Sequence, residues 1–106
     1  SKVDLLPFAI WKNNDLWNLL PATGAVNNKK RDRIPDPPFL ASRKEPIIGY
    51  WDLLHEHWPH RFEREIDVSL LGMDARKGDW QEHAFDQLSE KCTYLIEIRG
   101  YEPWSI

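Results

Sequence analysis

The second half of the chain carries apolar residues at helical spacing, and this pattern constrains the fold most. Five apolar side chains between 45 and 59 recur three or four residues apart: Ile47, Tyr50, Trp51, Leu54 and Trp58. This spacing places them on one face of an amphipathic helix, which we expect to be buried. Pro46 suits the first turn of that helix, and Pro59 predicts its end.

Two later segments show the same pattern. The apolar stripe of the first consists of Phe62, Ile66 and Leu70. Gly72 is expected to end this helix, because glycine accepts the left-handed backbone of a C-terminal cap. A longer helix is predicted from Asp79 as N-cap to Gly100. Its buried stripe would consist of Phe85, Leu88, Cys92, Leu95 and Ile98. Residues 45–106 are therefore predicted to form a helical subdomain.

The first part of the chain has a different pattern. The apolar run from Val3 to Leu6 predicts a strand, and residues 16–21 predict a second strand that ends at a proline. Thr23 is a suitable N-cap for a short helix that runs to about Arg31. Three prolines within "IPDPPF" predict that residues 36–44 are an extended connector. The predicted fold class is α+β.

Charge is distributed unevenly along the chain. Residues 1–44 contain eight Lys or Arg and four Asp or Glu, whereas residues 45–106 contain six and thirteen. The net charge is therefore +4 in the first part and −7 in the second, which together give −3. Such asymmetry favours a polyanion as the partner of the first part. Chance and ordinary helix surfaces are the alternative explanation.

Several classes of protein do not fit the sequence. No apolar run approaches the ~20 residues that a membrane-spanning helix needs, so no membrane partner is expected. Cys92 is the only cysteine, which excludes a disulfide framework within the chain and a cysteine-based zinc site. The beginning of the sequence lacks the layout of a signal peptide. We expect a cytoplasmic protein, in which Cys92 is buried and inert.

Three short motifs follow one another within the first 35 residues: V-D-L-L-P-F, N-L-L-P-A and N-N-K-K-R-D-R-I-P. Together they resemble the HNH endonuclease family, whose fold is a ββα-metal finger. The resemblance implies that residues 1–35 form such a module, that 36–44 connect it to the rest, and that the helices of 45–106 pack on it. It also implies hydrolysis of DNA phosphodiester bonds with the help of a divalent cation.

The resemblance assigns roles to particular residues. Its implied catalytic residues are Asp4, Asn18 and Asn27. Asp4 and Asn27 would be the metal ligands, and their hard oxygen atoms suit Mg²⁺ or Mn²⁺. Asn18 would support the site by holding a loop through backbone hydrogen bonds. Contacts with DNA phosphates are expected from Lys29, Lys30, Arg31 and Arg33.

The sequence departs from the family pattern after Asp4. The family has a histidine there, which acts as the general base, but here Leu5 follows directly. We favour a deletion of that histidine. In the ungapped alternative, Val3 stands at the Asp position and Asp4 at the His position. Both interpretations predict weak or absent catalysis, because neither leaves a histidine on the first strand.

Two other departures concern the boundaries of the module. Many relatives have a cysteine pair just before the third motif, but residues 22–27 contain no cysteine, so no structural zinc is expected. The chain also starts only three residues before Asp4, from which we expect it to be a piece of a longer polypeptide. Histidines occur later in "HEHWPH", but His55 and His57 lack the H-E-x-x-H spacing, and we expect them on the surface.

Each implied role has a plain structural alternative. Asp4 could be a strand-end carboxylate, Asn27 a residue on a helix surface, and the basic cluster a solvated face. Accordingly, the alternative function is a non-catalytic nucleic-acid-binding or interaction module on an HNH scaffold. A third possibility is an unrelated helical domain that binds a partner protein.

Overall fold

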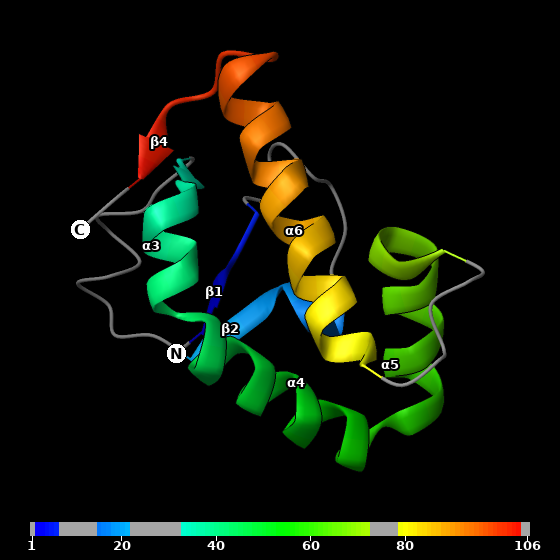
Figure 1. The fold of residues 1–106 in the computed structure, drawn as a ribbon. Helices are drawn as coiled ribbons and strands as arrows, with labels where there is room; N and C mark the ends of the chain where they lie inside the picture. The colour runs from blue at the N-terminus through cyan, green and yellow to red at the C-terminus, as the bar shows by residue number, and fades with distance from the viewer. Residues whose placement is uncertain (1, 7–14, 22–32, 73–78, 105–106) are drawn as a thin grey trace.

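Helices make up most of the fold, and its strands are short. The computed structural model describes residues 2–6, 15–21, 33–72 and 79–104 (Figure 1). Its elements in chain order are β1 (Lys2–Asp4), the 3-10 turn η1 (Leu16–Asn18), β2 (Leu19–Pro21), β3 (Ile34–Pro35), α3 (Pro37–Ser42), α4 (Lys44–His57), α5 (Pro59–Ile66), the π-helical segment η2 (Asp67–Leu71), α6 (Trp80–Glu97) and β4 (Pro103–Trp104). A largely helical fold with a small β component agrees with the predicted α+β class.

Strands β1 and β2 pair antiparallel. The register sets Lys2 opposite Pro21, Val3 opposite Leu20 and Asp4 opposite Leu19. The two strands predicted here are therefore present, but both are shorter than predicted. Leu5 and Leu6 form a bend instead of continuing β1, because the backbone groups of Leu6 bond to a side chain instead of to a strand. The predicted helix over 23–31 lies outside the described residues.

The prediction of an extended connector over 36–44 was wrong, because α3 lies there. The side chain of Asp36 caps this helix, and its Oδ1 accepts a hydrogen bond from the backbone N–H of Phe39 at 2.9 Å. Pro37 and Pro38 occupy the first turn, where a helix needs no backbone donor. The same three residues that resemble a connector in sequence thus begin a helix.

The three predicted helices are present as α4, as α5 with η2, and as α6. Pro59 does not merely end α4, since it also begins α5 after a break at Trp58. The predicted glycine caps have left-handed backbone angles, with φ of 71° at Gly72 and 76° at Gly100. Two residues of the predicted buried stripes are exposed: Trp58 (53%) lies at the helix break, and Ile98 (70%) lies just beyond the end of α6.

A parallel pairing of β3 with β4 was not predicted. It sets Ile34 opposite Pro103 and Pro35 opposite Trp104, and the N–H of Ile34 donates to the carbonyl of Glu102 at 3.0 Å. Strands of two residues are too short to show a periodic pattern. Their pairing brings the segment that follows α6 beside the segment that leads into α3, as Figure 1 shows.

One hydrophobic core includes residues from the first part of the chain and from the helices. In Figure 1, α6 is flanked by α3 on one side and by α5 on the other. The buried residues of this core are Leu5, Leu6, Leu16, Trp17, Ile34, Leu40, Ile47, Trp51, Leu54, Phe62, Ile66, Leu70, Leu71, Ala84, Phe85, Leu88, Cys92 and Leu95. At its centre the indole Nε1–H of Trp51 donates to the carbonyl of Trp17 at 2.8 Å. The predicted burial of Cys92 is confirmed.

An ion pair between Lys44 and Glu82 joins the start of α4 to α6. The hydrogen bond with Glu82 raises the pKa of Lys44, and desolvation lowers it to a smaller extent. The negative charges of Glu82 and Asp86 raise the pKa further. The pKa of Lys44 is thus higher in the folded state than in the unfolded state. The pair therefore stabilises the fold at pH values below the ordinary lysine pKa of about 10.4, and this stabilisation is lost as the pH rises through the raised pKa. Exposure to solvent keeps this contribution small.

We predict that Trp51→Phe destabilises the protein by about 1–3 kcal/mol, because it removes the buried donor to the Trp17 carbonyl and part of a fully buried ring. The matched control is Trp58→Phe at the half-exposed tryptophan, which should change stability by no more than about 0.5 kcal/mol. Urea unfolding followed by circular dichroism measures both. Equal midpoints for the two variants would contradict a central role for this contact.

Candidate functional site

A buried asparagine fixes the chain where β1 ends. Asn18 is fully buried, and its Oδ1 accepts the backbone N–H of Leu6 at 2.7 Å. Its Nδ2 donates back to the carbonyl of the same residue at 2.9 Å. In addition, the N–H of Leu5 donates to the backbone carbonyl of Asn18 at 2.7 Å. We call these three hydrogen bonds the Asn18 clamp, and they satisfy buried polar groups that water cannot reach.

The clamp lies directly beside the end of β1. Asp4 is the last residue of β1, and its backbone is paired with Leu19, the residue after Asn18. Asn18, the last residue of η1, is therefore one residue away from the backbone partner of Asp4. The placement of the Asp4 side chain is not described, and Asn27 lies outside the described residues. Hydrogen bonds to backbone groups of a loop are what the resemblance implies for Asn18.

Of the four basic residues expected to contact phosphates, the structure describes Arg33. Its side chain is partly exposed, and its Nε lies 3.7 Å from an Oε atom of Glu102, in the segment that precedes β4. An exposed pair at this distance is weak. The other three residues, Lys29, Lys30 and Arg31, lie outside the described residues.

Helical residues that the sequence analysis did not single out hold the segment before β2. The backbone N–H of Leu16 donates to Oε1 of Glu65 in α5 at 2.8 Å. Asp15 Oδ2 accepts from Ser69 Oγ of η2 at 2.6 Å and from the indole Nε1 of Trp17 at 2.9 Å. Sequence offered no signal for these contacts, because Glu65 and Ser69 are 49 and 54 residues from their partners.

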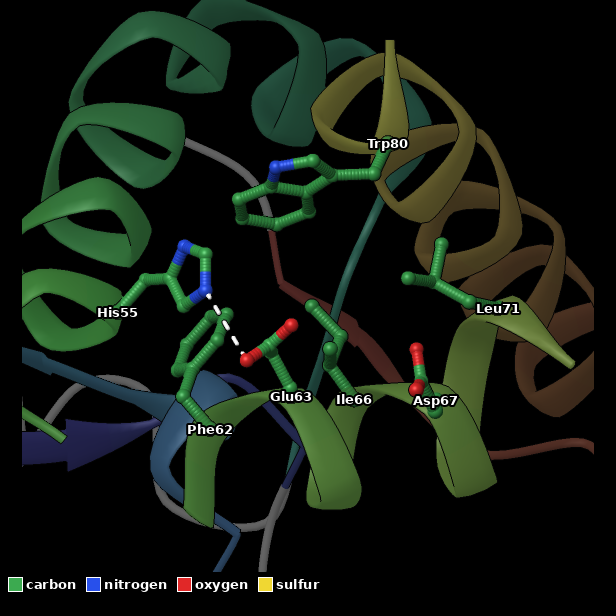
Figure 2. Close-up of a pocket in the computed structure, with 7 residues that line it drawn as sticks. All are labelled: His55, Phe62, Glu63, Ile66, Asp67, Leu71 and Trp80. Carbon is green, nitrogen blue, oxygen red and sulfur yellow. Dashed lines mark ion pairs between the residues drawn. The ribbon is translucent and has the colours of Figure 1, made fainter. Parts of the chain in front are cut away.

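A separate pocket of about 210 Å³ lies between α4, α5, η2 and the start of α6. Figure 2 shows His55 and Trp80 facing Phe62 and Glu63, with Asp67 and other residues along the floor. The Nε2 of His55 lies 3.7 Å from a carboxylate oxygen of Glu63. The side chain of His55 is partly buried, although a surface position was expected for it. The side chain of His57 is exposed, as expected. Within the described ranges, no three metal-ligating side chains gather to form a metal site.

Comparison with known proteins adds no assignment. No protein-family model matches the sequence, and no curated protein and no solved structure matches it either. Among the residues that the structure describes, no helix is both long and apolar enough to cross a membrane.

We predict that Asn18→Ala destabilises the protein by about 2–4 kcal/mol, because the buried N–H and carbonyl of Leu6 both lose a partner. Asn18→Asp keeps the acceptor for the N–H, but its carboxyl can donate to the Leu6 carbonyl only when it is protonated. Burial beside that carbonyl raises the folded pKa of the introduced carboxyl above its unfolded value of about 3.9.

It follows that the stability deficit of Asn18→Asp relative to the parent is smallest below that unfolded pKa and grows as the pH rises through the folded pKa. Asn18→Ala introduces no titrating group, so its deficit should stay constant. Denaturant unfolding of the three proteins from acid to neutral pH measures this. A constant deficit for both variants would exclude the reciprocal bond to the Leu6 carbonyl.

Proposed function

We propose that this chain contains an HNH-like ββα-metal module that binds DNA and a divalent cation, and that it hydrolyses phosphodiester bonds only weakly. The observation that carries the proposal is the Asn18 clamp. A fully buried asparagine holds the backbone of Leu6, two residues after Asp4 at the end of β1. The spacing of the three motifs and the basic residues around 29–33 support the same conclusion.

The proposed metal ligands have suitable chemistry for the expected cations. The carboxylate of Asp4 and the amide oxygen of Asn27 are hard donors, which fit Mg²⁺ or Mn²⁺, with water as the remaining ligands. Such a cation, when bound, stabilises negative charge on the phosphate oxygens and on the leaving oxygen. No cysteine is available in the chain segment where relatives hold zinc, so a structural zinc is not part of the proposal.

The residue after Asp4 explains why the proposed activity is weak. Leu5 is an apolar residue, is buried, and donates its backbone N–H to the carbonyl of Asn18. A leucine side chain cannot accept the proton of an attacking water, so the general base of the family has no counterpart at this point. The same observation favours the second candidate function, a non-catalytic module on this scaffold that binds nucleic acid.

DNA binding should depend steeply on salt and little on sequence, because phosphate contacts release counterions and read no bases. We predict that Arg33→Ala lowers the slope of log affinity against log salt by about one unit. Glu102→Gln removes the carboxylate that pairs with Arg33 and should strengthen binding by about twofold. Fluorescence anisotropy with a labelled duplex at several salt concentrations measures both effects.

The matched control for this experiment is Arg64→Ala, which removes an exposed positive charge from α5. It should leave the salt slope unchanged. If Arg33→Ala and Arg64→Ala behave alike, Arg33 makes no phosphate contact. An affinity that does not respond to salt in the parent protein would exclude phosphate binding altogether.

Catalysis should be recoverable by restoring the histidine. General-base catalysis contributes ~10²–10⁴-fold, so inserting a histidine between Asp4 and Leu5 should raise the nicking rate of supercoiled plasmid by about that factor. Asp4→His without insertion should recover much less, because it removes the proposed ligand. The ungapped alternative predicts the reverse order, with the largest gain for Val3→Asp combined with Asp4→His. Rates are measured with Mg²⁺ and with Mn²⁺.

An insertion also disturbs the β1–β2 pair, since one extra residue either shifts the register or forms a bulge. Inserting an alanine at the same point controls for this disturbance and should give no gain in rate. If no histidine variant cleaves faster than the parent, the nuclease proposal loses its main support. The binding module then becomes the better description, provided that the parent binds DNA.

A further inference from the structure

The pocket between α4, α5, η2 and the start of α6 has a wall of three aromatic rings. His55, Phe62 and Trp80 each come from a different helix, and their ring centroids lie 5.5–5.8 Å apart in all three pairs. Such separations are typical of packed rings. Trp80 also stacks on the buried Trp51 at 6.4 Å, which connects the wall to the core. The aromatic side of the pocket is therefore held in place by packing.

Two carboxylates line the pocket from the side of α5 and η2. Glu63 and Asp67 are four residues apart, so they lie on the same helical face. Figure 2 shows both carboxylates rising from this segment on the side where Trp80 lies. The Nε2 of His55 is 3.7 Å from the Glu63 carboxylate, which is longer than a hydrogen bond. Like charges at this spacing repel each other, and a bound cation would relieve that repulsion.

The size of the pocket restricts the ligand to a small molecule. Its volume is about 210 Å³, and the buried side chains of Ile66 and Leu71 add an apolar surface between the carboxylates and the rings. An apolar cavity of about 150 Å³ holds one benzene molecule, whereas pockets for drug-sized ligands measure about 300–1,000 Å³. The space therefore suits one aromatic ring with a short chain.

The charges around the pocket select a cation. The residues that line it include two acids and neither Lys nor Arg, and residues 45–106 carry a net charge of −7. No group of three metal-ligating side chains occurs among the residues that the structure describes, so an organic cation fits better than a metal ion. An ammonium group donates charge-assisted hydrogen bonds to carboxylates, and its positive charge is attracted by an indole face.

We propose that this pocket binds a small aromatic amine as its ammonium ion. The ammonium group pairs with Glu63 and Asp67, and the ring packs against Trp80. The π-helical turn that begins at Asp67 is of a rare kind that often occurs at functional sites. None of the residues that line the pocket lies in β1 or β2, so this inference goes beyond the proposed function and does not depend on it.

The first test compares ligands of similar shape on the unmodified chain. Phenylethylammonium is the cationic probe, phenylethanol its neutral counterpart and phenylpropanoate the anionic one. Calorimetry measures affinity, and NMR of the Trp80 indole N–H reports whether the ligand enters this pocket. Because both carboxylates are partly exposed, phenylethylammonium should bind about fivefold more tightly than phenylethanol, and phenylpropanoate should not bind. Butylammonium has the charge without the ring and should bind more weakly than phenylethylammonium.

The second test removes the charges of the pocket one at a time. Glu63→Gln and Asp67→Asn keep the side-chain shape, and each should weaken binding of phenylethylammonium by up to about fivefold while leaving phenylethanol unaffected. The matched control is Glu90→Gln, which removes an exposed carboxylate ten residues beyond Trp80 on α6. It should not change either affinity. Urea unfolding shows whether each variant is folded, and the ligand comparison decides the question even where a variant is not.

Each outcome supports or overturns the proposal. Preference for the ammonium ion that decreases in both pocket variants and persists in Glu90→Gln supports it. Equal affinities for phenylethylammonium and phenylethanol overturn it, because the pocket would then be merely apolar. Binding that leaves the Trp80 indole N–H unshifted, or that weakens equally in Glu90→Gln, places the ligand elsewhere and also overturns it. Butylammonium that binds as tightly as phenylethylammonium overturns the assignment of an aromatic ligand.

Discussion

The two hydrogen bonds between the Asn18 side chain and the backbone of Leu6 are the constraint on which the rest of the structure depends. Both groups are buried, so water cannot replace either partner, and the amide of asparagine supplies the one donor and one acceptor that a single residue's backbone requires. The clamp ends β1 at Asp4 and turns Leu5 and Leu6 into the core. Strand β2 then starts directly after Asn18, which fixes the register of the β1–β2 pair.

The helices and the β1–β2 pair depend on one another for burial. A chain of 106 residues has enough apolar surface for one core but not for two, and here Trp17 and Trp51 share it at full burial. Strands of three residues would not be stable alone in water. The contacts of Trp51, Glu65 and Ser69 with the segment before β2 therefore give the helical part a direct role in holding the end of β1 in place.

Sequence predicted the parts of the fold that repeat and missed the parts that depend on distant contacts. Helices α4 and α6 followed from apolar spacing, and the left-handed glycine caps followed from Gly72 and Gly100. The segment around Asp36 was misjudged, because Asp-Pro-Pro fits both a connector and a capped helix start, and packing decides between them. Pairing of β3 with β4 joins residues about 70 positions apart in the sequence and leaves no local pattern. For the candidate site, the motif spacing singled out Asn18. In the sequence, however, nothing distinguishes Glu65 from any other glutamate on a helix surface.

The contacts that hold the end of β1 are separable from the proposed catalytic group, as the Asn18 clamp shows. It uses the side chain of Asn18 and the backbone groups of Leu5 and Leu6, none of which depends on which side chain follows Asp4. A histidine in that place would contribute proton transfer but no bond of the clamp. Under the proposed function, the absence of a histidine there would remove proton transfer and leave the β1–β2 pair and the buried asparagine in place. The contacts that hold the end of β1 are therefore independent of the side chain at the position where the proposed general base would stand.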